Sequence, residues 1–328
     1  MREVVLTRRP SGRPTAGCFD VIDRPVPGLT AGCLLMRAAA ISVDPSMIPR
    51  LTVATYAPAF QLGTAIEARA VGQVVRSAAD GWEEGDWALF PGGWRDLAVV
   101  EAGSALRIHP SDALPPHMWL HAFGVPGLTA YIGLLKVAQV QPGETVWVSA
   151  AAGAVGSVAA QLARARGAGM VIGSTGGTDK ARYLTEALGL DAAVDYRAGR
   201  LREQLHQAAP EGIHVYFDNV GGDHLEAALD IMRVGGRIAA CGMISGYGVR
   251  QPGPANLAEI IVKRLRLEGF LVLDHLHRRA EFEAEVAPLL EAGRLRADVT
   301  VFEGIDSAPQ ALLSLLDGTK IGKALVRP

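Results

Sequence analysis

The amino-acid sequence predicts an α/β protein in which a doubly wound parallel sheet domain is combined with a second domain rich in β-strands. From Thr145 onward, apolar runs typical of strands alternate with amphipathic segments at helical spacing. From Met1 to about Pro116, short β-type runs are broken by Gly, Pro and Asp, which is typical of an antiparallel barrel or sandwich. These two patterns together predict the fold class.

The composition is that of an ordinary globular protein. The chain has 328 residues, 49% of them hydrophobic, and a formal net charge of −2. This length favours about two domains, and a charge near zero argues against a nucleic-acid or anionic-membrane surface. The first ten residues lack an apolar signal-peptide core, and no apolar run reaches ~18 residues. We therefore expect a cytoplasmic protein that acts on a small molecule.

The cysteines and histidines do not predict a metal site. Cys18, Cys33 and Cys241 are too few and too scattered for a disulfide framework or a four-thiolate zinc site, so we interpret them as reduced thiols. His117 and His121 are four residues apart but lack a nearby third ligand. We expect no bound metal.

The strands of the β-rich part are short and closely spaced. Turn residues such as Pro25, Gly81, Gly85 and Pro91 separate them, and no long helical pattern interrupts them. We therefore expect strands within residues 3–8, 19–23, 33–43, 70–75, 86–90, 94–100 and 105–110.

The α/β part begins after residue 120. A helical segment precedes residue 137, and the strand–helix alternation then continues to a long helix near residues 278–292. The pattern reverts to short strands around one short helix at the end of the chain, which could return it to the first domain. We predict a β-rich domain of residues 1–120 and 297–328 and a parallel-sheet domain of residues 121–296. Within the latter we expect strands near 145–149, 169–174, 191–196 and 264–272, further strand and helix signals within 213–222 and 236–245, and helices near 154–166, 179–188, 201–208 and 224–232.

A glycine turn links the first strand of this domain to its helix. The segment "TVWVSAAAGAVGSVAAQLARAR" passes from β-type alternation into helical spacing, with Gly153 and Gly156 at the junction. Such a turn lets backbone N–H groups and the helix N-terminus approach a pyrophosphate. Against the G-x-G-x-x-G pattern, Ala151 replaces the first glycine. We predict cofactor binding by Gly153, Ala154, Val155 and Gly156; the alternative is a helix start that needs small residues only for packing.

Several strings resemble one enzyme superfamily over essentially the whole chain. They are "VDPSM", "VPGLTAYIGLL", "SAAAGAVGS", "DKARYL", "YFDNVGG" and "IGKALV". Together they look like the medium-chain dehydrogenase/reductase superfamily, in its zinc-free branch of prostaglandin/leukotriene reductases and double-bond reductases. The resemblance implies a GroES-like catalytic domain, an inserted Rossmann domain and a homodimer joined through the Rossmann sheets. It also implies NADPH-dependent reduction of a double bond conjugated to a carbonyl.

The resemblance also bears on zinc. Zinc alcohol dehydrogenases of this superfamily carry a cysteine in the loop that here reads "SVDPSM", and a His-Glu pair where this chain has "GTAIEARAVG". Neither ligand set is present, and the four-cysteine structural lobe is missing too. Without a Lewis acid, alcohol oxidation loses its usual electrophile, whereas conjugate reduction needs only a hydrogen-bond donor for the enolate.

The end of the second strand favours NADPH over NADH. NAD sites usually carry an acid there, but Gly173, Ser174 and Thr175 are uncharged. Lys180 stands where the related reductases keep a phosphate-binding lysine, and the resemblance assigns Tyr196 to the same phosphate. The alternative for Lys180 is a solvated lysine at a helix start.

The resemblance assigns six further residues to the cofactor. Four of them would border the pyrophosphate or the nicotinamide ribose, and two would offer backbone groups to the nicotinamide amide. Cys241 could instead be a small buried hydrophobe, and Phe270 a core residue. The six are Asn219, Cys241, Ile244 and Ser245, followed by Phe270 and Val272.

The substrate side is predicted from the resemblance and from two departures. Tyr247 matches a tyrosine of the family's active site and could hydrogen-bond the enolate oxygen, or it could only line the pocket. Tyr56 matches a pocket residue of bacterial relatives. Ser46 replaces a substrate-enclosing tyrosine, which opens space beside Asp44, and Lys320 replaces an asparagine. The lysine could favour an acidic substrate or point to solvent.

Three functions compete on these grounds. The first is an NADPH-dependent reductase of α,β-unsaturated aldehydes and ketones that transfers hydride to the β-carbon. The second is an NADPH quinone oxidoreductase on the same fold with a flatter pocket. The third is an NADPH-binding protein without turnover, which the retained Tyr56 and Tyr247 make less favoured.

Overall fold

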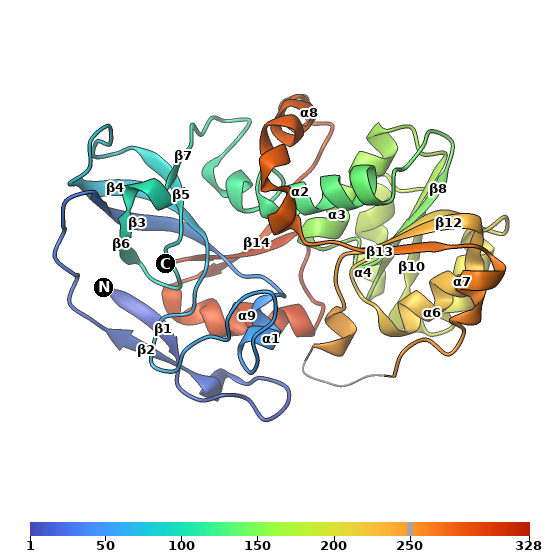
Figure 1. The fold of residues 1–328 in the computed structure, drawn as a ribbon, viewed down its shortest axis with the longest axis horizontal. Helices are drawn as coiled ribbons and strands as arrows, with labels where there is room; N and C mark the ends of the chain where they lie inside the picture. The colour runs from blue at the N-terminus through green and yellow to red at the C-terminus, as the bar shows by residue number, and fades with distance from the viewer. Residues whose placement is uncertain (248–251) are drawn as a thin grey trace. The chain divides into compact units, whose positions relative to one another are not determined.

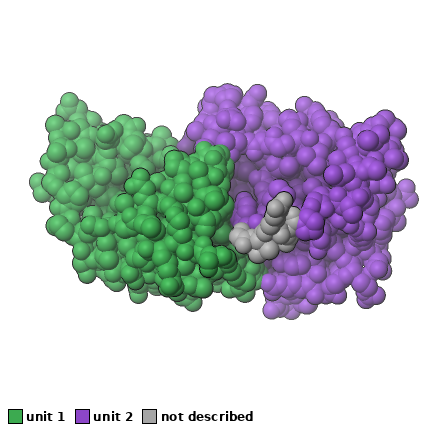
Figure 2. All heavy atoms as spheres, turned by 60° about the horizontal axis from the view of Figure 1, so that its bottom comes forward, with its two compact units in different colours: residues 1–120, 299–328 green, residues 121–298 purple. Residues whose placement is uncertain are grey.

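The computed structural model describes residues 1–247 and 252–328, which form two compact units. Unit 1 comprises Met1–Leu120 and Val299–Pro328, and unit 2 comprises His121–Asp298 (Figures 1 and 2). Unit 2 is thus inserted in the sequence between two pieces of unit 1. In the described part of the chain, no helix has both the length and the apolarity that crossing a membrane requires.

Unit 1 is built on a seven-stranded sheet and a separate two-stranded one. The central strand β3 (Cys33–Ser42) pairs antiparallel with β4 on one side and with β6 and β15 on the other. The strands β14 and β15 pair in parallel, and the helix α9 (Ala308–Leu316) connects them. The other strands are β1 (Arg2–Leu6), β2 (Phe19–Asp23), β4 (Ala70–Ser77), β5 (Trp87–Phe90), β6 (Leu97–Glu101), β7 (Leu106–Arg107), β14 (Val299–Glu303) and β15 (Lys323–Arg327).

Alternating burial along the strands creates the core of unit 1. In the first part of β3, Leu34, Met36 and Ala38 are buried at every second position, as expected for a strand with one face toward a core. The core is closed by aromatic residues, among them Phe19 and Trp94, whose ring centroids lie 5.9 Å apart. Fully buried members include Val4, Leu6, Leu34, Met36, Ile41, Val71, Phe90 and Trp94.

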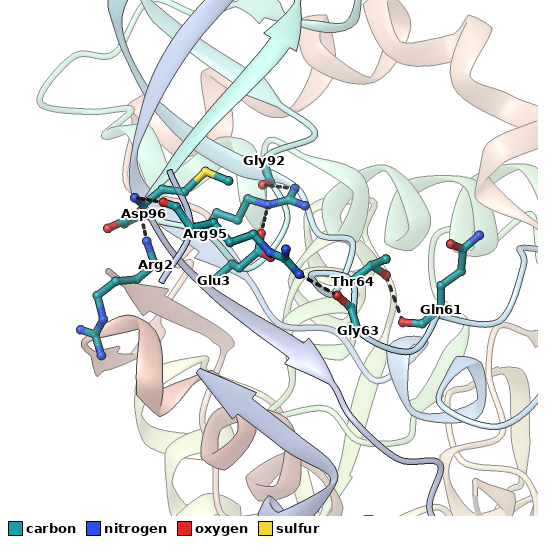
Figure 3. A network of polar contacts seen from close by, with 10 residues as sticks. Arg2, Glu3, Gln61, Gly63, Thr64, Gly92, Arg95 and Asp96 are labelled. Atoms are coloured by element: carbon teal, nitrogen blue, oxygen red, sulfur yellow. Dashed lines mark hydrogen bonds and ion pairs between the residues drawn. The ribbon is translucent and has the colours of Figure 1, made fainter. Parts of the chain in front are cut away.

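A buried carboxylate fastens β1 to two loops of unit 1. Glu3 is 2% exposed and pairs with Arg24 at 2.5 Å and with Arg95 at 2.8 Å. Figure 3 shows Arg95 between Glu3 and the carbonyl of Gly92, while Arg24 also donates to the carbonyl of Gly63 at 3.1 Å. These arginines lower the pKa of Glu3 although its burial alone would raise it. The charge is therefore retained inside the unit because both its oxygens are paired.

Unit 2 is a six-stranded parallel sheet in the order β10-β9-β8-β11-β12-β13. Numbered within the unit this is 3-2-1-4-5-6, the order of a doubly wound dinucleotide-binding sheet. The chain reverses direction across the sheet between β8 and β11, so ligands are expected at the carboxyl ends of these strands. The strands are β8 (Thr145–Val148), β9 (Met170–Thr175), β10 (Ala192–Asp195), β11 (Ile213–Asp218), β12 (Met232–Ala240) and β13 (Arg266–Gly269).

Helices connect the strands of unit 2, as the alternating sequence pattern predicts. The expected helix at 179–188 consists of α4 (Thr178–Arg182) and a π-helical turn, Tyr183–Ala187. The short helix α7 (Ala258–Val262) was missed, because the pattern there offers only five helical residues. The remaining helices are α2 (Val125–Tyr131), α3 (Ala154–Ala165), α5 (Leu201–Ala208), α6 (Gly222–Ile231) and α8 (Arg279–Glu291), with α1 (Met47–Arg50) in unit 1.

Candidate cofactor and substrate sites

The turn after β8 places a helix N-terminus at the reversal point of the unit 2 sheet. Gly153 caps α3, and a Cβ atom at Gly156 would lie 2.3 Å from the carbonyl oxygen of Ala150. Only glycine therefore allows α3 to start this close to the turn. The N–H groups of Ala154, Val155 and Gly156 open the helix, where helix geometry gives them no intrahelical acceptor. This end of α3 is suited to a pyrophosphate.

The structure explains why alanine replaces the first glycine of the fingerprint. Ala151 is fully buried and its N–H donates to the carbonyl of Ser174 at 3.0 Å. Its methyl group lies beside Gly173 in β9, where an added Cβ would approach it to 2.8 Å. The glycine that this close contact requires is therefore Gly173, in the neighbouring strand. The left-handed conformation of the turn falls on Ala150, whose φ is 48°.

The tip of β9 carries no charge of its own, and polar groups of the next strand lie beside it. Ser174 and Thr175 are buried. A Cβ atom at Gly176 would lie 2.8 Å from the hydroxyl of Tyr196 and 2.9 Å from Nε of Arg197, so both side chains lie against this glycine. The structure thus brings Tyr196 to the strand end where the resemblance expects the phosphate.

Lys180 lies in α4, close to these groups. Burial is the larger cause that lowers the pKa of its ammonium group to about 8, and the charge of Arg197 adds to the effect. Lys180 is half-buried. A half-buried cation near a second cation is suited to binding an anion.

A hydrogen-bond network joins the carboxyl ends of β8 and β11. The backbone N–H of Asn219 donates to the hydroxyl of Ser149 at 2.9 Å, and its side-chain amide donates to the carbonyl of Ser149 at 2.7 Å. The Asp218 carboxylate accepts the N–H groups of Val220 and Gly221 at 2.9 and 2.8 Å. Burial raises the pKa of Asp218. These bonds fix the turn that carries Asn219.

The residues after β12 pack against the same turn. The N–H of Cys241 donates to the carbonyl of Asp218 at 2.8 Å, and Ser245 donates from its hydroxyl to Val220 at 2.6 Å. Burial, followed by the Asp218 charge, raises the pKa of the Cys241 thiol to about 12, so it is a protonated, unreactive group at neutral pH. The N–H of Ile244 donates to the carbonyl of Asn219 at 3.3 Å.

Tyr247 lies directly after this segment. Its N–H donates to the carbonyl of Ile244 at 3.2 Å, and its hydroxyl would lie 3.9 Å from a Cβ atom at Gly242. Unit 2 thus brings Tyr247 into the neighbourhood of Asn219 and Cys241, residues that the resemblance assigns to the cofactor.

Phe270 and Val272 follow β13 at the edge of the sheet. The Phe270 ring packs edge-on against Phe217, with ring centroids 6.4 Å apart, and both rings lie where a Cβ of Gly133 would be. The half-buried side chain of Phe270 therefore packs against the sheet. Val272 is half-buried at the start of the following 3₁₀ turn.

In unit 1, Ser46 lies in a loop fixed by a buried lysine. Ser46 is half-buried immediately before α1. Lys323 is 1% exposed and donates to the carbonyl of Val43 at 2.5 Å, while its ammonium lies 3.0 Å from the Asp44 carboxylate. The hydroxyl of Ser42 donates to the other oxygen of Asp44. The loop that carries Ser46 is thus anchored through its backbone and through Asp44.

Tyr56 and Lys320 have different surroundings. Tyr56 is 56% exposed on a loop whose ends are joined by Arg9, which donates to the carbonyls of Leu51 and Phe60 at 2.9 Å each. The ammonium of Lys320 lies 4.7 Å from the centre of the Phe302 ring, a cation–π contact. Lys320 is therefore half-buried on an aromatic face of unit 1.

Sequence reasoning missed several groups that the structure brings to these sites. Arg197 follows Tyr196 directly, and its positive charge beside a predicted phosphate ligand was the available signal. Ser149 and Asp218 lie within recognised motifs but act through hydrogen bonds to other segments, and Lys323 pairs with a residue far away in the sequence. Among the described residues, no group of three His, Cys, Asp or Glu side chains could hold a metal ion.

Two sequence families match the chain. One, described as zinc-binding dehydrogenase, matches residues 154–292, and another, described as the N-terminal domain of oxidoreductase, matches residues 2–108. The NADPH-dependent curcumin reductase of Escherichia coli (strain K12) is 34% identical in sequence, over 99% of this chain and 96% of the reductase. The 2-alkenal reductase (NADP(+)-dependent) of Nicotiana tabacum is 38% identical in sequence, over 89% of this chain and 86% of that reductase.

A solved structure agrees with these relatives. The crystal structure of CurA in complex with NADPH from Vibrio vulnificus has a TM-score of 0.94 and 34% identity, covering 100% of this chain and 99% of that one. The predicted combination of a GroES-like β domain and a Rossmann sheet is therefore confirmed. Full-length similarity at this identity is decisive for the family. The chain belongs to the medium-chain dehydrogenase/reductase superfamily, in its branch of NADP-dependent double-bond reductases.

Proposed function

We propose that the protein reduces the carbon–carbon double bond of α,β-unsaturated aldehydes and ketones with NADPH, without zinc. The observation that carries the cofactor assignment is the uncharged tip of β9 beside Lys180, Tyr196 and Arg197. Similarity to a curcumin reductase and a 2-alkenal reductase supports the reaction. In this proposal unit 2 binds the cofactor and carries Tyr247, and unit 1 supplies contacts to the substrate.

The residues of unit 2 fit a phosphorylated dinucleotide. Gly156 allows the N-terminus of α3 to receive a pyrophosphate, and Lys180 supplies a cation for a 2′-phosphate. Bound NADPH supplies the hydride for the β-carbon of the substrate. The residues proposed to hold the rest of the cofactor are Tyr196, Asn219, Cys241, Ile244, Ser245, Phe270 and Val272.

Tyr247 is the proposed electrophilic group. As the β-carbon gains hydride, negative charge develops on the carbonyl oxygen of the substrate, and a phenol hydroxyl is a suitable donor to that oxygen. Tyr247 lies beside Gly242 on the turn that also carries the proposed cofactor residues. The α-carbon then takes its proton from a tyrosine or from water.

Unit 1 supplies the proposed substrate contacts, Tyr56, Ser46 and Lys320. The exposed ring of Tyr56 is available to an aromatic or alkenyl substrate, and the small side chain of Ser46 favours a larger or more polar substrate than a tyrosine would. Lys320 would favour a substrate that carries an acidic group, at a position set by its contact with Phe302.

We also propose a homodimer formed through β13. This strand is the edge of the unit 2 sheet, and apolar side chains around it are exposed: Ile261 is 80%, Val262 64% and Leu267 40% accessible. An edge strand flanked by exposed apolar residues is a template for pairing with a second copy. Sedimentation equilibrium should give the dimer mass for the natural protein and the monomer mass for an Ile261→Asp, Val262→Asp variant; a natural monomer would contradict the proposal.

The reaction is tested with purified protein and a panel of acceptors. NADPH oxidation would be followed with a 2-alkenal, an aryl enone, a benzoquinone and a saturated aldehyde, and the products identified by mass spectrometry. We expect the alkenal and enone to gain two hydrogens across the double bond while the saturated aldehyde is unchanged. Faster turnover of the quinone would replace this assignment with a quinone oxidoreductase. NADPH binding without oxidation by any acceptor would refute catalysis of this class.

A further inference from the structure

Arg197 belongs to a small polar structure that joins two loops of unit 2. One oxygen of the Asp195 carboxylate accepts the N–H of Gly177 at 2.8 Å and the N–H of Arg197 at 3.0 Å. Gly177 follows β9 and Arg197 follows β10. A single carboxylate therefore sets the distance between the loop at the β9 tip and the residue that carries the guanidinium.

The side chain of Arg197 lies against the β9 loop. An added Cβ at Gly176 would be 2.9 Å from its Nε atom, a separation that real Cβ atoms essentially never have. The Tyr196 hydroxyl occupies the other side of the same glycine, at 2.8 Å from that Cβ position. Glycine at 176 thus admits a guanidinium and a phenol hydroxyl together.

Arg197 and Lys180 place two positive charges near one another at this tip. Burial is the larger cause that lowers the pKa of the Lys180 ammonium, and the charge of the Arg197 guanidinium lowers it further, so the two charges repel each other. The last residues of β9, Ser174 and Thr175, are uncharged, and the Asp195 carboxylate at the end of β10 accepts the backbone N–H groups of Gly177 and Arg197. An arrangement in which like charges converge on an uncharged strand end is stabilised when a dianion lies between them.

We propose that Arg197 is a second cation that binds the 2′-phosphate of the cofactor together with Lys180, and that Asp195 positions it. This inference rests on the NADPH assignment in the proposed function. The planar guanidinium can donate two parallel hydrogen bonds to a phosphate monoester, whereas the ammonium acts as a compact charge. Asp195 does not contact the phosphate in this proposal; it holds the Arg197 backbone beside the β9 loop.

The test measures cofactor binding rather than turnover. Dissociation constants of NADPH, NADH and 2′,5′-ADP would be determined by titration calorimetry for the natural protein and for Arg197→Gln. We expect Arg197→Gln to weaken NADPH and 2′,5′-ADP by about tenfold or more, since it removes a charge-assisted pair, and to change NADH less than about twofold. The salt dependence of NADPH binding should become shallower as well.

A matched control is available on the neighbouring helix. Arg182 pairs with Asp179 at 2.8 Å and its side chain is 61% exposed, so Arg182→Gln removes the same charge from a solvated site. We expect it to leave the ratio of NADPH to NADH affinity unchanged. Equal weakening of NADPH and NADH by Arg197→Gln, or no weakening of NADPH, would overturn the assignment.

The positioning role of Asp195 has its own measurement. Asp195→Asn retains an oxygen acceptor for Gly177 and Arg197, whereas Asp195→Ala removes it. We expect Asp195→Ala to weaken NADPH selectively, as Arg197→Gln does, and Asp195→Asn to restore most of the affinity. An Asp195→Ala variant that retains full selectivity for NADPH would contradict the positioning role of Asp195.

Failure of the proposed function would be recognised separately. Natural protein that binds 2′,5′-ADP no more tightly than 5′-ADP would refute the NADPH assignment, and with it this inference. Natural protein that binds NADPH selectively but reduces no enone would refute the reaction alone, and the Arg197 measurements would still decide the phosphate contact.

Discussion

The two units hold their candidate site residues in different ways. In unit 2 the residues lie on turns after neighbouring parallel strands, and backbone hydrogen bonds such as Ile244 to Asn219 join one turn to the next. In unit 1, Tyr56 lies on an exposed loop and Lys320 packs on Phe302. The proposed pyrophosphate site thus depends on backbone placement, while the proposed substrate recognition depends on individual side chains.

The largest expected effect comes from the backbone turn of unit 2. Gly156→Ala places a Cβ within 2.3 Å of the Ala150 carbonyl, so the turn or the start of α3 must move. We expect NADPH affinity to fall by about 100-fold or more, because displacement of the donors by about 1 Å is enough for such a loss. Fluorescence titration of NADPH measures this.

Gly103→Ala is the matched control in unit 1, since an added Cβ there meets no atom within 4 Å. It should leave NADPH affinity and melting temperature nearly unchanged. Unaltered NADPH binding in Gly156→Ala would show that backbone placement does not limit cofactor recognition, and the comparison between the units would lose its basis.

Lys323→Met tests whether the two units respond separately. It removes a buried cation and leaves the Val43 carbonyl and the Asp44 carboxylate without it. Because Asp44 is about one-third exposed, we expect a loss of about 2 kcal/mol in unfolding free energy, below the value for a fully buried pair. Urea denaturation measures this loss, and titration of NADPH should show unchanged affinity.

Lys320→Met provides the comparison for a lysine of the same strand region. Its ammonium lies on the Phe302 ring in a half-buried position, so its removal should reduce stability by less than about 1 kcal/mol. If Lys323→Met weakened NADPH binding as much as it weakened stability, the units would not be energetically separable.

Tyr247→Phe separates hydrogen bonding from pocket shape. It removes only the hydroxyl, and we expect kcat for an enone to fall about 10- to 100-fold because a donor to the developing oxyanion is lost. NADPH affinity should stay unchanged. Steady-state kinetics with an alkenal provides the measurement, with Tyr56→Phe as the matched variant in unit 1. A fall of less than about threefold would leave Tyr247 as a wall of the pocket.

A further expected effect is a pH dependence of cofactor affinity. Lys180 has a pKa of about 8, lowered first by burial and then by Arg197, and a bound dianion would raise it again. Above pH 8 binding must therefore take up a proton, and NADPH affinity should fall by up to about tenfold per pH unit. Below pH 8 Lys180 is already charged and this dependence disappears, while NADH should show little of it.

Lys180→Arg checks the origin of that dependence, since arginine stays protonated throughout this range. The variant should bind NADPH with a flat profile between pH 8 and about pH 10. A profile as steep as that of the natural protein would assign the titration to another group. Calorimetry in buffers of different ionisation enthalpy would count the protons taken up.

Most of the fold could be predicted because its signals are local. Helix α5 has the predicted bounds, Leu201–Ala208, and α8 begins and ends within one residue of the predicted ones. The helix at 179–188 was predicted without its π-helical turn, because hydrophobic spacing does not distinguish i→i+4 from i→i+5 hydrogen bonds. The α7 helix is too short for periodicity to reveal it.

The site was less predictable where it depends on contacts between distant segments. Gly173 in β9 leaves room for the methyl group of Ala151, which follows β8. Lys323 pairs with Asp44, although most of the sequence separates the two residues. Cys241 was open to two interpretations; it is half-buried, and burial raises the pKa of its thiol to about 12. No spacing rule in the sequence encodes such contacts.

The sequence by itself determined the doubly wound domain, the glycine turn and the family. Each of them is recognised from short stretches of consecutive residues, whose patterns are local. Only the tertiary structure decided which charges gather at the β9 tip and why Ala151 is tolerated. The physical reason is that a pKa and a steric limit depend on everything within a few ångströms, and strands distant in sequence supply those neighbours.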